Sequence, residues 1–154
     1  IKTATSLPFG SLSLYNKYVK GFLPTEKELL RMKNHVTKKL NEFEGLVSPS
    51  NTDLICGVGG TVRAARKLNN KISKLPEDNN VIKITHLHKI FNDYILKRRK
   101  FVKNLIKVAP DRLHTIIPGM IILETVASYY SSSEIQVSDF GVREGYLYKA
   151  LNEQ

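Results

Sequence analysis

The stretch that decides the fold is Asp53-Leu54-Ile55-Cys56-Gly57-Val58-Gly59-Gly60-Thr61. Its short apolar run before the first glycine is typical of a strand rather than a helix. After the glycines, Val62, Ala65 and Leu68 recur at helical spacing. The sequence therefore predicts a strand, a Gly-rich turn and a helix over residues 53–71, with Thr61 as the helix N-cap.

The Gly-rich turn at Gly57–Thr61 is the sharpest local feature of the sequence. Glycines after a strand let a backbone approach a ligand closely, and the start of the next helix favours a bound phosphate. The spacing matches neither the Rossmann fingerprint nor the P-loop. A phosphate cradle and simple tight packing of strand on helix therefore both stay open at this point.

Other segments along the chain also carry recognisable patterns. Ser11–Tyr15 alternates polar and apolar residues and predicts a strand, after a kink at Pro8 and Gly10. Thr25 and Glu28 have the spacing of a capping box. This box starts a helix whose apolar stripe begins at Leu29 and which ends at Gly45. Further expected elements are a helix capped by Thr85 and breaking near Lys97, a turn at Pro110, a buried helix at 120–130, a strand at 135–138 and a last helix from Val142. Strands and helices alternate, so the expected class is α/β, with a mixed sheet flanked by helices.

The bulk properties are those of one soluble globular domain. The chain has 154 residues, of which 42% are hydrophobic and 25% charged. No apolar run has the length of a membrane span, so we expect no membrane association. Cys56 is the single cysteine, which excludes a disulfide framework, favours a cytoplasmic setting and predicts a buried thiol.

The formal charge of +10 is unevenly distributed. Residues 57–75 contain five basic side chains and no acidic one, and residues 89–107 contain seven basic side chains and Asp93. Such a field attracts polyanions. A solvated basic surface without a ligand is the alternative, and charge alone does not separate the two.

Several kinds of active site find no support in the sequence. The four histidines, at positions 35, 86, 88 and 114, lack partners at metal-ligand spacing. No serine lies in a nucleophile elbow, and no pair of carboxylates is placed for acid–base work. We therefore expect no catalytic residue and no metal ligand in this chain.

Four blocks in this order resemble the exopolyphosphatase and guanosine pentaphosphate phosphohydrolase (Ppx/GppA) family of the actin-like ATPase superfamily. They are Ser6–Leu14, Gly57–Val62, Arg112 followed by Pro118-Gly119, and Val137–Tyr148 with its Ser-Asp-x-Gly-x-Arg-Glu-Gly sequence. The resemblance implies two ribonuclease-H-like domains with the substrate between them. Residues 1–154 would form the second of these as a single domain.

The resemblance also implies a reaction and a site. Water would attack a terminal phosphoryl group of polyphosphate or guanosine pentaphosphate with the help of Mg²⁺, in the cytoplasm and, for the guanosine nucleotide, in the stringent response. Gly57, Gly59, Gly60, Thr61 and Arg112 would border the cleft and bind the phosphates or the nucleotide.

Two further candidates follow from the same blocks. Gly10 could bring its backbone to the substrate or merely bend the chain. Arg143 could bind phosphate, or could serve with Glu144 to hold the last helix to the sheet. For Arg112 a surface ion pair is the alternative to a cleft ligand.

The sequence departs from the family in what precedes Ile1. The first domain, with its phosphate loop and the catalytic glutamate, is missing, so that domain is an expected partner and this chain alone is expected to be inactive. The unpaired edge at Ile1–Thr5 predicts pairing with a second copy, a homodimer. The alternative function is a non-catalytic module that binds guanosine polyphosphates or polyanions; a nucleic-acid module is third, because no recognition motif is present.

Overall fold

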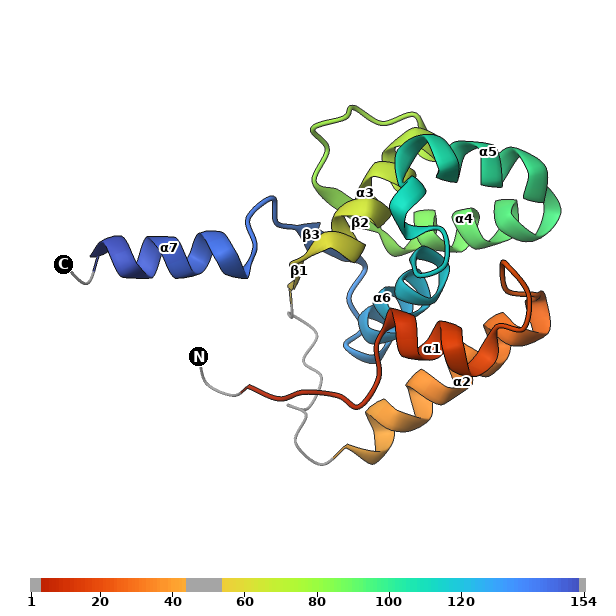
Figure 1. Ribbon diagram of the computed structural model, residues 1–154, viewed down its shortest axis with the longest axis horizontal. Coiled ribbons are helices and arrows are strands. Elements are labelled where there is room, and N and C mark those ends of the chain that lie inside the picture. The colour runs from red at the N-terminus through yellow and green to blue at the C-terminus, as the bar shows by residue number, and fades with distance from the viewer. Residues whose placement is uncertain (1–3, 44–53, 153–154) are drawn as a thin grey trace.

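A computed structural model describes residues 4–43 and 54–152 of the chain. It has the predicted α/β organisation, with a mixed sheet of three strands among the described residues and helices against it (Figure 1). The elements are α1 (Ser11–Tyr18), α2 (Glu26–Glu42), β1 (Ile55–Gly57), α3 (Gly60–Ser73), β2 (Val81–Lys83), α4 (Ile84–Leu96), α5 (Arg98–Val108), the 3-10 turn η1 (Pro110–Arg112), α6 (Ile116–Tyr129), β3 (Glu134–Val137) and α7 (Val142–Asn152).

Strand β3 lies in the middle of the sheet. It pairs in parallel with β1, so that Ile55 faces Ile135, and antiparallel with β2, so that Ile82 faces Ile135. Because β1 and β3 run in the same direction, the turns that follow them leave the sheet at the same edge. This topology brings the Gly-rich turn next to the Ser138–Gly141 turn.

Helix α6 forms the centre of the core. It is apolar on nearly all sides, and Ile116, Ile117 and Met120 are fully buried. It packs against α1, α2, α3 and α4, which explains why its sequence has no polar stripe. Its buried Glu124 accepts hydrogen bonds from Lys33 Nζ (2.7 Å) and His88 Nε2 (3.0 Å), so this histidine joins two helices.

The predicted capping box of α2 is confirmed. Thr25 Oγ1 accepts a hydrogen bond from the Glu28 amide (3.4 Å), while the Glu28 carboxylate accepts from the amides of Thr25 (2.7 Å) and Lys20 (3.1 Å). The predicted apolar stripe is buried as well, from Leu29 to Leu40. The predicted end at Gly45 lies outside the described residues; within them, the helix ends at Glu42.

The hydrogen bonds to Glu28 predict acid sensitivity. The bond from the Thr25 amide holds the pKa of this buried carboxyl below its ordinary value of 4.5. A carboxyl whose pKa is lower in the folded than in the unfolded state stabilises the protein at pH values above its unfolded-state pKa. This stabilisation is lost as the pH falls through the folded-state pKa. We expect the free energy of unfolding in urea to decrease from pH 5 downward.

The variant Glu28→Gln should lose about 0.5–2 kcal/mol at pH 7 and flatten that pH dependence. Glu26→Gln, at an exposed position in the same helical turn, is the matched control and should change stability by less than about 0.5 kcal/mol. Equal acid sensitivity in the Glu28→Gln variant and the wild type would contradict the assignment.

The strand predicted at Ser11–Tyr15 is wrong, because these residues begin helix α1. Leu14 is buried while Leu12 is 58% exposed, and half-buried Tyr18 continues the side of Leu14 one turn later. The alternation spans too few residues to separate a period of 2 from one of 3.6. The strand predicted around Ile1 lies largely outside the described residues.

Two predicted N-caps are also wrong. Gly59, not Thr61, caps α3, and Lys83, not Thr85, caps α4. In the first case the positive φ of Gly59 turns the chain two residues earlier than expected. The predicted strand over 53–56 is found at Ile55–Gly57, with Asp53 outside the described residues.

Cys56 is exposed, which corrects the prediction of a buried thiol. It lies on the edge strand β1, where Ile55 and Gly57 are half-buried and the side chain between them points to the other face. The predicted breaks are confirmed: α4 ends at Leu96 next to Lys97, and a turn begins at Pro110.

Helix α7 differs most from expectation. Its apolar residues predict a packed helix, yet every residue from Val142 to Asn152 is exposed, and α7 extends away from the rest of the chain (Figure 1). It is therefore not held against the sheet. Among the described residues, no helix is both long and apolar enough to cross a membrane.

Candidate functional site

The Gly-rich turn leaves β1 and enters α3 through an unusual backbone conformation. Gly59 has φ 115° and ψ 176°, a region that is essentially reserved for glycine. As the N-cap it has no side chain to bond the first amides of the helix. Gly57 is needed for packing, since a Cβ there would lie 2.6 Å from Val62 Cγ2. The turn therefore packs tightly on α3, and its cap residue Gly59 leaves the first backbone amides of α3 without a side-chain hydrogen bond.

Arg112 lies against this helix start. A Cβ added to Gly60 would come within 2.9 Å of Arg112 Cζ, so the guanidinium occupies the space that a larger side chain would fill. The ion pair of Arg112 Nε with the exposed Asp111 Oδ2 is long, at 3.6 Å, and contributes little energy. Gly60 and Arg112, 52 positions apart in the sequence, are therefore neighbours.

Three helices begin close to Gly60. A Cβ on Gly119, in the first turn of α6, would overlap with the Thr61 methyl group and lie 3.6 Å from Ser11 Cβ. The starts of α1, α3 and α6 therefore converge, and Gly10, the N-cap of α1, belongs to the same region. Helix starts carry partial positive charge, so this region favours anions.

The turn that follows β3 is bonded to the Gly-rich turn and to α3. The Ser138 amide donates to the Gly57 carbonyl (2.9 Å). Arg66 Nη1 pairs with Asp139 Oδ1 (2.7 Å), and Arg63 donates to the Asp139 carbonyl (3.1 Å). The side chain of Arg66 is 11% exposed and that of Asp139 is 64% exposed, so this pair joins α3 to the turn after β3 at the surface.

The Ser138–Gly141 turn joins β3 to α7, where a strand at 135–138 and a helix from Val142 are predicted. Glu144 Oε2 accepts a hydrogen bond from the Gly141 amide (2.7 Å). Bonds from the amides of Glu144 and Gly141 lower the pKa of this carboxyl. Arg143 is exposed at the start of the projecting α7, and the structure does not place it with Gly59, Gly60 and Arg112.

Among residues 4–43 and 54–152, no group of three or more His, Cys, Asp or Glu side chains lies together in a way that could hold an ion.

Sequence reasoning missed the Arg63–Arg66–Asp139 contacts and the contact of Thr61 with Gly119. In the sequence alone, both arginines belong to the basic run 57–75. Their spacing of three residues puts them on one side of a helix, which is a usable signal, but their partner is more than 70 positions away.

The fold is similar to solved structures of Aquifex aeolicus proteins. One, described as the PPX-GPPA enzyme, has a TM-score of 0.74 and 24% identity over 96% of this chain and 49% of its own. Another, a crystal structure of the Ppx/GppA family member, has a TM-score of 0.73 and 25% identity over 97% and 49%. An exopolyphosphatase-like protein matches with a TM-score of 0.71 and 16% identity over 91% and 46%.

These likenesses confirm the predicted ribonuclease-H-like fold of the actin-like type. The chain spans about half the length of the proteins it matches. The sequence model of the Ppx/GppA phosphatase family matches residues 1–154, which is the whole of this sequence. The chain therefore belongs to the Ppx/GppA phosphatase family.

Proposed function

We propose that this chain is part of a phosphohydrolase that releases the terminal phosphate of inorganic polyphosphate or guanosine pentaphosphate. In this proposal it forms the second domain and contributes one wall of the substrate cleft. The observation that carries the proposal is the Arg112 guanidinium lying against Gly60 at the start of α3.

The chemistry of phosphoryl transfer supports this role. Such reactions depend mainly on positioning and on neutralising the charge that spreads over the phosphoryl oxygens. A guanidinium binds two phosphate oxygens at once, and a helix start adds backbone amides and partial positive charge. Gly59 and Gly60 carry no Cβ that would keep a phosphate from these groups.

The remaining parts of the reaction are assigned to the other half of the longer protein. We propose that the other half supplies the catalytic glutamate and a phosphate loop and holds Mg²⁺. Among the described residues of this chain, no group of three or more His, Cys, Asp or Glu side chains lies together. The chain alone should therefore be inactive. We further propose a cytoplasmic setting for the longer protein.

The test is phosphate release by the longer protein with Mg²⁺, from polyphosphate and from guanosine pentaphosphate in separate assays. We expect turnover of at least one substrate and none by the 154-residue chain. The variant Arg112→Gln should reduce kcat/KM, with Arg31→Gln, at an exposed position of α2, as the matched control. Absence of turnover with both substrates would refute the proposal.

A further inference from the structure

A groove between α2 and α4 shares no lining residue with the Gly-rich turn or with Arg112. It has a volume of about 580 Å³, which lies in the range of pockets that bind small molecules. Both helices present apolar side chains to it at spacings of three and four residues, and α6 contributes two buried side chains. The apolar lining residues are Leu29, Leu30, Phe91, Ile95 and Ile121.

The groove is polar at one end and apolar along the rest. Lys33 of α2 and His88 of α4 meet there at Glu124 of α6. From His88 to Ile95 the groove follows α4 for seven residues, or about 10 Å. Its walls are open to solvent, since Leu30 is 60% and Ile95 40% exposed. A ligand with an apolar body would remove this surface from water, which is favourable.

Glu124 is the feature of the groove that packing does not explain. It is 3% exposed and lies on a helix that is apolar on nearly all sides. A buried ion pair is seldom more stabilising than apolar side chains of the same volume. Its Oε1 accepts the bonds from Lys33 Nζ (2.7 Å) and His88 Nε2 (3.0 Å), whereas its Oε2 accepts none from the described residues. This oxygen is therefore available to a donor group of a ligand.

The charges at the polar end match a ligand that carries both signs. A cationic head group alone would bind Glu124 but would be repelled by Lys33, and an anionic head group alone would be repelled by Glu124. The side chain of Lys33 is 47% exposed and makes one hydrogen bond, so that two of its N–H donors are available. An ammonium group on Glu124 and a carboxylate on Lys33 would use both partners.

We propose that this groove binds an α-amino acid with a large apolar side chain. The ammonium group of the ligand donates to Glu124 Oε2, and its carboxylate accepts from Lys33 Nζ. Its side chain lies between Leu30 of α2 and Phe91 and Ile95 of α4. An α-amino acid carries its two charges on one carbon atom, which suits the adjacent charges of Lys33 and Glu124.

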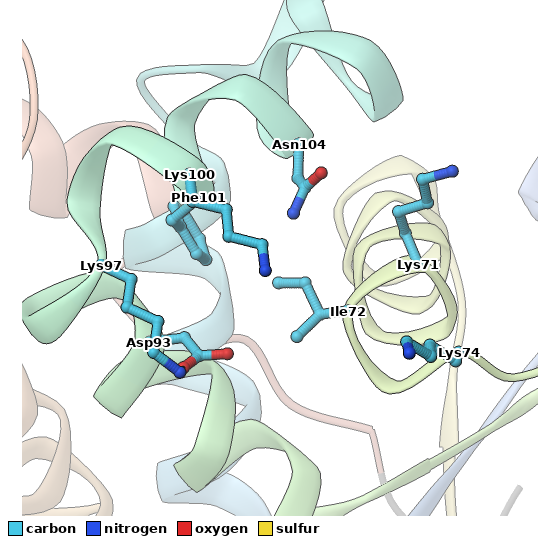
Figure 2. Close-up of a pocket in the computed structure, with 8 residues that line it drawn as sticks. All are labelled: Lys71, Ile72, Lys74, Asp93, Lys97, Lys100, Phe101 and Asn104. Carbon is cyan, nitrogen blue, oxygen red and sulfur yellow. The ribbon is translucent and has the colours of Figure 1, made fainter.

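The groove is separate from the basic surface between α4 and α3. Figure 2 shows Asp93 and Lys97 on that side, across from Lys71 and Lys74 of α3. Asp93 pairs there with Lys97 (2.9 Å). None of these side chains lines the groove, so substitutions in the groove leave that surface unchanged.

The first test compares three ligands that share one apolar body. NMR titration of the 154-residue chain measures the affinity for L-phenylalanine, for 2-phenylethylamine, which lacks the carboxylate, and for 3-phenylpropanoate, which lacks the ammonium group. We expect L-phenylalanine to bind at least about tenfold more tightly than either of the others, because each of them loses one charge-assisted contact. No binding of L-phenylalanine, or an affinity no higher than that of the amine or the acid, would overturn the proposal.

The apolar walls are tested with two double variants of matched exposure. Leu30→Ala/Ile95→Ala alters the groove, and Leu12→Ala/Ile106→Ala removes exposed apolar side chains outside it. The groove variant should lose about tenfold in affinity for L-phenylalanine and the control less than about twofold. Circular dichroism checks that both fold. Equal losses would mean that the ligand does not lie in the groove.

The polar end is tested with Lys33→Gln, and Arg31→Gln at an exposed position of the same helix is the control. Lys33→Gln should weaken binding of L-phenylalanine about tenfold without weakening that of 2-phenylethylamine, because only the carboxylate loses its partner. A merely structural role of Lys33 would lower both affinities alike, and that result would contradict the assigned contact. No phosphate compound enters these measurements, so their outcome is independent of the proposed hydrolysis.

Discussion

Replacing Gly60 with alanine should weaken phosphate binding at the start of α3 by about 10- to 100-fold, with little change in stability. The new Cβ would occupy the place of the Arg112 guanidinium and move it away from the helix start. Hydrogen bonds to charged groups contribute about 1.5–3 kcal/mol, which corresponds to this range of affinity. Calorimetry with pyrophosphate measures the effect.

Stability should be nearly unchanged for two reasons. The displaced group is the end of a flexible side chain that is 36% exposed. Alanine is also better than glycine inside a helix by up to about 1 kcal/mol, and Gly60 is the first residue of α3. Urea unfolding should therefore separate lost binding from lost folding.

A double-variant comparison shows whether Arg112 carries the effect. Arg112→Gln alone should weaken pyrophosphate binding as much as Gly60→Ala, and the two together should do no more than either one. Additive losses from Gly60→Ala and Arg112→Gln would mean that the guanidinium is not part of this site.

The central unit of the fold follows from local sequence. A few apolar residues, a Gly-rich turn and the spacing of Val62, Ala65 and Leu68 were enough to predict β1 and α3. The capping box at Thr25 was equally clear, because all its partners lie within four positions. Features whose physical causes lie within one turn of chain are those that the sequence predicts best.

Structural features that depend on residues far away in the sequence could not be predicted from local patterns. The helical state of Ser11–Tyr18 depends on burying Leu14 in the core formed with α6, roughly 100 positions later. The exposure of Cys56 depends on its place at the sheet edge, not on its apolar neighbours. In the candidate site, Gly59 and Gly60 were predictable as a turn, whereas the contact of Gly60 with Arg112 required the fold or the family resemblance.

The contact between Thr61 and Gly119 gives the last prediction. It joins the starts of α3 and α6, and a Cβ at Gly119 would overlap with the Thr61 methyl group. Overpacking of this kind costs about 1–3 kcal/mol, of which the better helix propensity of alanine offsets up to about 1 kcal/mol. We expect Gly119→Ala to lower the free energy of unfolding by about 1–2 kcal/mol and to shift the start of α3.

Thr61→Ser removes the methyl group with which the new Cβ would collide, while it keeps the hydroxyl. The double variant Gly119→Ala/Thr61→Ser should therefore regain most of the lost stability, with a coupling energy of about 1–2 kcal/mol between the two positions. Urea unfolding of the four proteins in the cycle measures this coupling. If the losses in free energy of unfolding from the two changes simply add, the contact with Thr61 is not the reason for a glycine at position 119. If they couple and pyrophosphate affinity recovers with stability, the packing of α6 on α3 also sets the geometry at which Gly60 and Arg112 meet a phosphate.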